Sequence, residues 1–210
     1  MAAVNPPALD RPLPKMIVFD LDYTLWPFWV DTHVAPPLRP NAQHSAATDR
    51  TGEQLAFYQD VPAMLDQLRR SDVRLGVASR TSAPHLASEL LTMLHLPPTL
   101  PSSSSSSSSS SLPAAAAEVQ EEAGAGKPRR ALDVFDGGLE IYPSSKIRHM
   151  EAIKARTGID FQDILFFDDE SRNRETERLG LTMWLVRDGM TWEELQKGLA
   201  EWRRRRRRGL

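Results

Sequence analysis

Two aspartates separated by one residue, Asp20 and Asp22, directly follow the apolar run of residues 16–19. Such a run is typical of a buried parallel strand, and open α/β sheets place their ligands at the carboxyl ends of their strands. Alternate side chains of an extended chain point the same way, so the two carboxylates can converge while Leu21 faces the protein. Converging carboxylates repel each other, and a hard divalent cation is the expected counter-charge. The alternative is a turn in which both aspartates cap backbone N–H groups.

Further polar side chains follow two other apolar runs, residues 73–78 and 164–167, and a lysine begins a helix between them. Because the carboxyl ends of parallel strands meet at one edge of a sheet, we expect all of these side chains to border the same crevice. The polar residues are, in chain order, Ser79 and Arg80, then Lys146, then Asp168 and Asp169.

These residue types together suit the transfer of a phosphoryl group. One carboxylate can attack phosphorus to form an aspartyl-phosphate, and a second can protonate the leaving alcohol and then activate water. Mg²⁺ takes carboxylate, water and phosphate oxygens, while serine, arginine and lysine donate to the other phosphate oxygens. Singly, each residue also has a structural explanation: Ser79 as a helix N-cap, Lys146 as a surface charge, and Arg80 as the partner of a nearby acid.

The elements that must position this set alternate between strands and helices, which is the pattern of a parallel α/β sheet. Thr191 and Glu194 form a capping-box pattern, and Asp60 is the expected N-cap of an earlier helix. The polar, proline-containing segment 36–52 is expected to be a loop. Expected strands cover residues 16–19, 73–78, 139–142, 164–167 and 182–186, and expected helices cover residues 60–70, 86–94, 144–158, 170–179 and 191–202.

The length and composition of the chain limit the classes of protein to which it can belong. Its 210 residues suffice for one domain with its own core, and the absence of cysteine excludes disulfides, thiolate metal sites and cysteine nucleophiles. It has no apolar stretch of the ~18 residues that a transmembrane helix needs, so we expect no membrane association. We expect a monomer in a reducing compartment, the cytoplasm or the nucleus.

Three segments are expected to lie outside the folded domain of residues 15–202. Residues 1–14 are rich in proline and form an expected disordered leader, and residues 97–131 contain an unbroken serine run and form an expected disordered insert. Residues 203–210 form a basic tail that begins with six consecutive arginines, in a chain whose net charge is −2. Such a run can bind nucleic acid, but a solvated end of the last helix explains it equally well, and we expect no nucleic-acid partner.

The polar motifs resemble those of one known family. Asp20-Leu21-Asp22-Tyr23-Thr24 matches the D-x-D-x-T motif of the haloacid dehalogenase (HAD) superfamily. Ser79, Lys146 and the pair Asp168-Asp169 follow in the order and spacing of its other motifs. The stretch from Phe19 to Val34 is also similar to the magnesium-dependent phosphatases of that superfamily, which have no large cap domain.

The resemblance implies a HAD-like Rossmannoid parallel sheet flanked by helices, without a large cap, and Mg²⁺ as the cofactor. It implies hydrolysis of a phosphorylated small molecule or a phosphotyrosine protein through an aspartyl-phosphate. Asp20 would be the nucleophile and a metal ligand, and Asp22 the acid/base, which also binds the metal through its backbone oxygen. Asp168 would be the remaining metal ligand. The phosphate would be held by the Leu21 backbone, Ser79, Arg80 and Lys146.

Two assignments stay open within this resemblance. Asp169 either orients Lys146, which we favour, or replaces Asp168 at the metal. Thr24 would support the site from behind. Ser144 stands where the family is expected to have a glycine, which loosens the expected geometry of the turn before Lys146.

Other functions use part of the same set. A receiver-type signalling module also combines aspartate, lysine and magnesium, but its phosphorylated aspartate lies on a later strand. A dehalogenase of the same superfamily needs no metal and would leave Asp22 without a role, and an idle phosphate-binding protein would not need the full set. The substrate stays open between phosphotyrosine and sugar phosphates such as fructosamine phosphates. Trp26, Phe28 and Trp29 could stack on either substrate or belong to the core.

Overall fold

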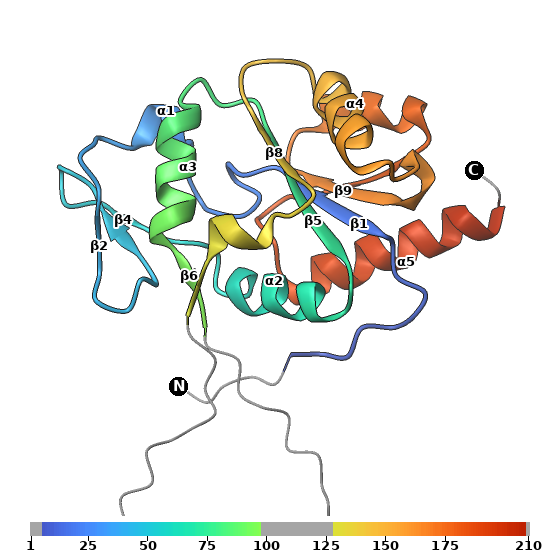
Figure 1. The fold of residues 1–210 in the computed structure, drawn as a ribbon, viewed down its shortest axis with the longest axis horizontal. Helices are drawn as coiled ribbons and strands as arrows, with labels where there is room; N and C mark the ends of the chain where they lie inside the picture. Colours follow the sequence, from blue (N-terminus) through green and yellow to red (C-terminus); the bar gives the residue numbers. More distant parts are fainter. Residues whose placement is uncertain (1–5, 98–127, 209–210) are drawn as a thin grey trace, which may run out of the picture.

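A five-stranded parallel sheet lies at the centre of the fold, with its strands in the order β10-β9-β1-β5-β8 (Figure 1). This computed structural model describes residues 6–97 and 128–208. Each strand coincides within about one residue with the apolar run that predicts it, which confirms the α/β class. The strands are β1 (Met16–Phe19), β5 (Arg74–Ser79), β8 (Gly138–Ile141), β9 (Ile164–Asp168) and β10 (Thr182–Leu185).

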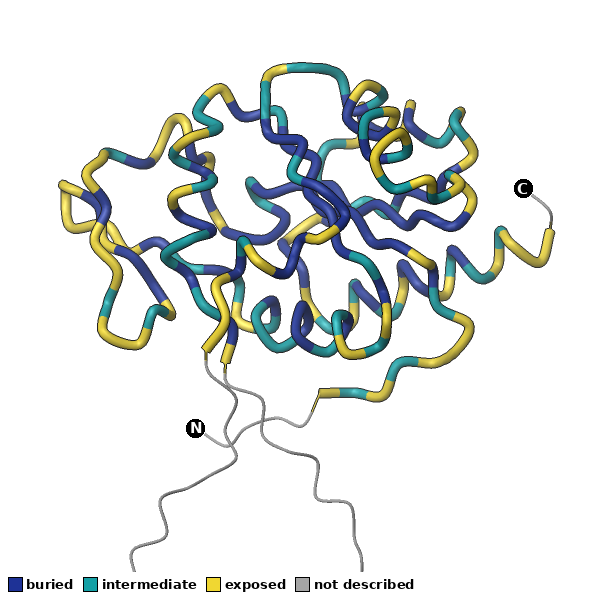
Figure 2. Tube along the Cα trace, in the orientation of Figure 1, coloured by how far each residue is buried: buried dark blue, intermediate teal, exposed yellow. Residues whose placement is uncertain are grey.

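Helices cover both faces of this sheet, because alternate side chains of each strand point to opposite faces. Ile17 and Phe19 pack into the larger hydrophobic cluster with α2, α3 and α5, whereas Met16 and Val18 pack into a smaller one with α4. Figure 2 shows the middle of the sheet as buried, and β1 and β9 are buried along their whole length. The helices are α2 (Val61–Arg70), α3 (Pro84–Met93), α4 (Lys146–Thr157) and α5 (Trp192–Arg208), with the 3₁₀ segment η3 (Ser171–Leu179) before β10.

The order of the strands places a crevice beside β1. The chain moves from β1 outward to β5 and β8, then returns to β9 on the other side of β1. Phe19 pairs in register with Val77 on β5 and with Phe167 on β9, and the N–H of Asp20 donates to the Phe167 carbonyl at 2.9 Å. The residues after Phe19 and Phe167 therefore meet at the point where the strand order reverses, which is where open α/β sheets bind ligands.

The expectation of a loop over residues 36–52 is wrong. This region forms a small antiparallel sheet of β2 (Arg39–Pro40), β3 (Ala47–Thr48) and β4 (Gln54–Leu55), preceded by the one-turn helix α1 (Val30–His33). Strands of two residues carry too little periodic signal to be predicted. The expectation of no large cap holds for the described residues, since this sheet is the main addition between β1 and α2.

The folded domain extends beyond the boundaries expected at both of its ends. Residues 6–14 are not a free leader, because the carbonyls of Pro7 and Ala8 accept hydrogen bonds from Gln67 on α2 and Gln196 on α5. The arginine run is not a separate tail but continues α5 to Arg208. Its side chains reach back to the body of the protein, for example through the ion pair of Arg205 with Glu177 at 2.7 Å.

The expected insert of residues 97–131 ends earlier than predicted, because residues 129–131 belong to the folded domain. Strand β7 (Arg129–Arg130) pairs antiparallel with β6 (His95–Leu96), and η1 (Ala131–Val134) follows directly. The serine run itself lies outside the described residues. None of the described helices is long and apolar enough to cross a bilayer.

One predicted helix cap is replaced by another. Asp60 makes no side-chain hydrogen bond to its own helix α2; its carboxylate accepts the N–H of Trp192 at 3.0 Å instead, and so ties the start of α5 to the start of α2. Thr191 does cap α5, accepting the N–H of Glu194 at 3.2 Å. The side chain of Glu194 accepts the indole N–H of Trp184 at 2.7 Å, so the capping box is half formed.

The turn that leads into α4 is fixed by a buried histidine. Ser145 is the N-cap of α4, and its hydroxyl accepts the N–H of Arg148 at 3.3 Å. His149 is inaccessible to solvent, its Nε2 donates to the carbonyl of Tyr142 at 3.1 Å, and its ring packs edge-on against that tyrosine at 4.5 Å. The side chain of His149 therefore links α4 to Tyr142, which lies at the start of the turn that precedes Lys146.

We expect His149 to make the stability of the fold depend on pH. Burial, with the nearby charge of Lys146, lowers the pKa of His149 to about 4, from an ordinary value of 6.5. Between these values the unfolded chain binds a proton that the folded chain does not. The contribution of His149 to the free energy of unfolding should therefore decrease as the pH is lowered from about 6.5 toward 4, by roughly 1 kcal/mol per pH unit.

Urea unfolding of the wild type and of His149→Gln at pH 7, 6 and 5 measures this contribution as the difference between the two slopes. His149→Gln should lose the component, while the control His85→Gln, at an exposed position on α3, should keep it. The same slope in wild type and His149→Gln would show that His149 does not contribute.

Candidate active site

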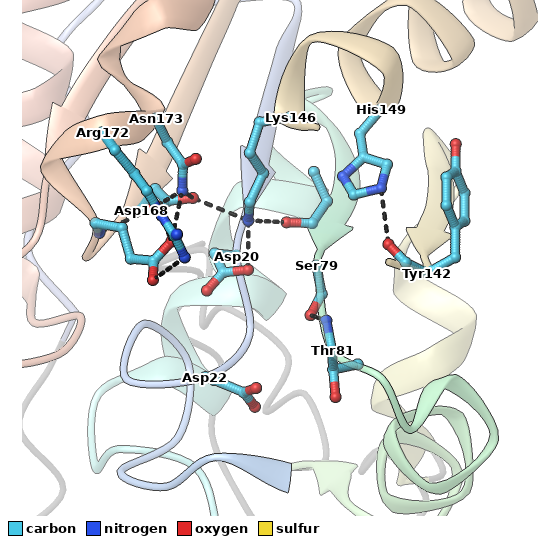
Figure 3. Close-up of polar contacts among 12 residues, drawn as sticks. Asp20, Asp22, Ser79, Thr81, Tyr142, Lys146, His149, Asp168, Arg172 and Asn173 are labelled. Carbon is cyan, nitrogen blue, oxygen red and sulfur yellow. Dashed lines mark hydrogen bonds and ion pairs between the residues drawn. The ribbon is translucent and has the colours of Figure 1, made fainter. Parts of the chain in front are cut away.

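The ammonium group of Lys146 lies at the centre of the crevice and contacts three strand ends. Its Nζ lies 2.5 Å from Oδ1 of Asp20, 2.5 Å from the carbonyl oxygen of Ala78 and 2.9 Å from Oδ2 of Asp168 (Figure 3). Lys146 is 1% exposed, although it is a residue type that is almost never buried without a partner. The surface-charge explanation of Lys146 is therefore wrong, and this side chain organises the site.

The charges around Lys146 do not balance. Burial would lower the pKa of Lys146, but Asp20 and Asp168 outweigh it and raise that pKa, so the ammonium stays charged. One ammonium cannot compensate two buried carboxylates. Burial raises the pKa of Asp20 well above its usual value, and the charge of Asp168 adds to the effect of burial. A further positive charge bound here would therefore be stabilised by the uncompensated carboxylate.

Asp168 makes the contact with Lys146 that we expect from sequence for Asp169. Asp168 is fully buried, and its oxygens accept hydrogen bonds from the N–H of Glu170 at 2.8 Å and from Nδ2 of Asn173 at 2.8 and 2.9 Å. Asp168, not Asp169, is the residue that orients Lys146. The carboxylate of Asp168 is thus occupied by protein donors, and our preference for it as the metal ligand loses its support.

Asp169 lines the cavity in front of these residues. Burial, together with the charge of Asp168, raises the pKa of Asp169 to about 6. Adjacent residues at the end of a strand point to opposite sides, so one of the two acids must face the interior and the other the crevice. The alternative that the sequence leaves open, Asp169 at the metal, is the one that the geometry supports.

Asp22 is positioned by the turn that follows β1. Its Oδ1 accepts the indole N–H of Trp26 at 2.7 Å and the backbone N–H of Val30 at 3.2 Å. Burial raises the pKa of Asp22 to about 6, although both hydrogen bonds oppose that shift. A carboxyl group with a pKa in this range can both donate and accept a proton near neutral pH.

The donors expected for phosphate line the same cavity. Ser79 and Arg80 come from the end of β5, and Thr81, which the sequence analysis does not single out, lines the cavity beside them. The N–H of Thr81 lies 3.4 Å from Oγ of Ser79. The Leu21 backbone is the exception: Leu21 is fully buried and is not among the residues that line the cavity, its carbonyl accepts three N–H groups of its own turn, and its N–H donates to no described residue.

Thr24 is not among the residues that line the cavity. It is fully buried, its hydroxyl has no partner among the described residues, and its carbonyl accepts the N–H of Met190 at 3.0 Å. Thr24 therefore joins the turn after β1 to the loop before α5. A role for its hydroxyl in the site stays a prediction.

The cavity has a volume of about 290 Å³ and is open to solvent on one side. Its rim contains residues that sequence reasoning misses, because no motif marks them. Trp29, Asp31 and Thr32 line one part of it, and Glu170 and Arg172 line another. Glu170 and Arg172 form a two-bond ion pair with N–O distances of 2.6 and 2.8 Å, so that their charges offset each other.

The donor set suits a hard divalent cation. Asp20, Asp22 and Asp169 all line the cavity, and within residues 6–97 and 128–208 no three acidic or histidine side chains gather into an all-protein cage. Mg²⁺ in phosphate-binding sites is usually held by one or two carboxylates, with waters and phosphate oxygens completing its octahedron. Oxygen donors on one edge, facing an open cavity, therefore fit Mg²⁺.

Comparisons with known proteins agree with this arrangement. A family model described as Acid Phosphatase matches residues 12–205. A HAD-like hydrolase superfamily protein of Schizosaccharomyces pombe is 39% identical over 170 residues, which cover 80% of this chain and 83% of that protein. Magnesium-dependent phosphatase 1 of Homo sapiens is 36% identical over 190 residues, covering 89% of this chain and 86% of that protein.

A solved structure shows the same fold at low sequence identity. A HAD-superfamily hydrolase from Ehrlichia chaffeensis aligns with a TM-score of 0.52 at 9% identity, over 92% of this chain and 99% of that one. This likeness bears on the fold alone, whereas the family match over residues 12–205 includes the residues of the crevice. The chain therefore belongs to the acid phosphatase family of HAD-like hydrolases.

Proposed function

We propose that this chain is a Mg²⁺-dependent phosphatase that hydrolyses phosphomonoesters through an aspartyl-phosphate on Asp20. The observation that carries the proposal is the position of Asp20: one carboxylate oxygen is held by the buried Lys146, and the carboxylate lines the cavity together with Asp22. The name of the human relative, Magnesium-dependent phosphatase 1, supports the same activity.

In the first step, Oδ2 of Asp20 attacks phosphorus and the bond from phosphorus to the leaving oxygen breaks. Lys146 holds Oδ1 and so fixes the carboxylate in one orientation. Asp22, in its protonated form, gives its proton to the leaving oxygen, which departs as an alcohol. The carboxyl of Asp22 is held for this task by Trp26 and Val30.

In the second step, the ionised Asp22 takes a proton from water as the water oxygen attacks phosphorus. The bond between phosphorus and Asp20 breaks, and inorganic phosphate leaves with both residues restored. Ser79 and Arg80, which line the cavity, would hold the phosphate oxygens during both steps, together with the backbone N–H of Leu21 beside it. Mg²⁺, when bound, supplies the positive charge that neutralises the phosphate against the acidic edge.

We assign the metal to Asp20, the backbone oxygen of Asp22, and Asp169. Asp168 takes the supporting role, because its oxygens accept hydrogen bonds from Asn173 and Lys146 in the interior. This assignment replaces Asp168 by Asp169 and keeps the rest of the expected set.

The substrate classes that we propose are phosphotyrosine proteins and sugar phosphates such as fructosamine phosphates. The lack of a large cap over the described residues leaves the cavity open to either class. A panel that compares phosphotyrosine peptides with sugar phosphates, scored by kcat/KM, separates the two. We propose a monomer in the cytoplasm or nucleus, to be tested by sedimentation of the purified chain and by imaging of a tagged one.

Asp20→Asn should abolish turnover and keep the fold. The amide cannot attack phosphorus, so we expect kcat on 4-nitrophenyl phosphate to fall roughly a thousandfold or more. Lys146 keeps its ion pair with Asp168 in this variant, so no buried charge is left unpaired and the melting temperature should not fall by more than a few degrees. The exposed Asp133→Asn is the control for a simple loss of charge, and normal turnover by Asp20→Asn would refute the nucleophile assignment.

Chelation should stop the reaction reversibly. We expect EDTA to remove hydrolysis of 4-nitrophenyl phosphate and added Mg²⁺ to restore it, while sodium chloride of equal ionic strength should not. Turnover that is indifferent to EDTA would instead favour the dehalogenase-type chemistry, which needs no cation.

Asp169→Asn and Asp168→Asn should fail in different ways. Asp169→Asn should weaken the stabilisation of the protein by Mg²⁺, measured as the cation concentration that raises the melting temperature, by about tenfold or more. Asp168→Asn should lower the melting temperature even without Mg²⁺, because it disturbs the buried contacts with Lys146 and Asn173. If Mg²⁺ did not raise the melting temperature of a folded Asp168→Asn protein but raised that of Asp169→Asn as in the wild type, Asp168 would be the metal ligand instead of Asp169.

A further inference from the structure

Trp29 is the one large hydrophobic side chain of the described residues that is exposed, at 50%, and it lines the cavity that contains Asp20. Its neighbours Trp26 and Phe28 are buried, and their rings stack on each other at 5.4 Å. From sequence, Trp26, Phe28 and Trp29 could each either belong to the core or stack on a substrate. The structure places Trp26 and Phe28 in the core. Only Trp29 offers a free aromatic surface.

The ring of Trp29 is held in place by its neighbours. It packs edge-on against Tyr23 at 5.1 Å and tilted against His33 at 5.3 Å. The backbone N–H of Trp29 donates to Nδ1 of His33 at 3.2 Å, which fixes the start of α1. A side chain held in this way can stack on a ligand with little further loss of conformational entropy.

Asp31 lies two residues further on and is tied to the loop that follows β5. Its Oδ2 accepts the N–H of Ser82 at 3.1 Å and the hydroxyl of Ser82 at 2.8 Å, and its Oδ1 accepts the hydroxyl of Thr32 at 3.0 Å. The small desolvation of Asp31 is outweighed by the hydrogen bonds from Ser82, so the pKa of Asp31 is below its ordinary value. The carboxylate is thus ionised and fixed relative to Arg80.

The charge of Asp31 is not compensated by an ion pair, in contrast to that of Glu170. Within the parts of the chain that the structure describes, no lysine or arginine lies within salt-bridge distance of Asp31, whereas Glu170 pairs with Arg172. The cations deeper in the cavity, Lys146 and Arg80, lie where the phosphate is expected to bind. The outer part of the cavity therefore combines one aromatic face with one net negative charge.

We propose that Trp29 and Asp31 form a subsite for the leaving group, which accepts a ring without a negative charge of its own; this inference rests on the phosphatase function proposed for the same cavity. Trp29 stacks on the ring, whether aromatic or sugar. Asp31 accepts hydrogen bonds from hydroxyl groups on the ring and repels leaving groups that carry a second anion. The substrate class is then a phosphomonoester of a ring that carries no negative charge besides its phosphate.

The test compares kcat/KM of wild type and variants on four phosphates: phenyl, ethyl, 4-carboxyphenyl and glucose 6-phosphate. Ratios between proteins on one substrate remove the intrinsic reactivity of that substrate. Trp29→Ala should lose about fivefold on phenyl phosphate relative to ethyl phosphate, and Trp29→Phe should recover most of it. Asp31→Asn should gain about fivefold on 4-carboxyphenyl phosphate relative to phenyl phosphate, whereas the control Asp133→Asn should not.

The glucose 6-phosphate arm identifies the source of the ring. A loss for Trp29→Ala on either ring class, the aryl or the sugar, supports the subsite and names its occupant. Unchanged ratios for Trp29→Ala and Asp31→Asn, in a wild type that hydrolyses these substrates, would overturn the subsite and leave the phosphatase proposal standing. A Mg²⁺-loaded wild type that hydrolyses none of the four would overturn both.

Discussion

One buried ammonium group holds the crevice together. Lys146 contacts the ends of β1, β5 and β9 at once, through Asp20, Ala78 and Asp168. Removing one partner of such a buried ion cluster commonly costs about 3–5 kcal/mol, because the remaining charge is left unpaired in a medium of low polarity. The contact between Lys146 and Asp20 stabilises the fold and also orients the Asp20 carboxylate in the cavity. Stability and reactivity therefore depend on the same interaction.

The helix that carries Lys146 must therefore be placed accurately, and a few contacts do this. Ser145 caps the helix, His149 holds the preceding turn, and Gly158 ends the helix in the left-handed conformation at φ 69°. Behind Asp168, the amide of Asn173 occupies both carboxylate oxygens. The groups that touch a ligand are thus backed by buried groups that touch only protein, which keeps the arrangement rigid.

Sequence predicts the frame of this site well, because its signals are local and strong. Runs such as residues 164–167 mark buried strands, and the polar residues that follow them include Asp20, Ser79 and Lys146. That Asp168 rather than Asp169 contacts Lys146 could not be predicted, since it depends on the direction in which the side chains at the end of β9 point. Asn173 and Asp31 carry no motif, and the extension of α5 through the arginines is stabilised by contacts to distant acids.

The hairpin of β6 and β7 joins two parts of the chain that are far apart in sequence. Leu96 pairs with Arg129 and His95 pairs with Arg130, and the N–H of Ala131 donates to the carbonyl of Leu94 at 2.8 Å. These backbone hydrogen bonds set where the chain re-enters the core through Ala131 and Val134, both of which are buried. The strand β8 that follows, and with it the turn that leads to Lys146, therefore starts from a position that main-chain pairing fixes without the help of any particular side chain.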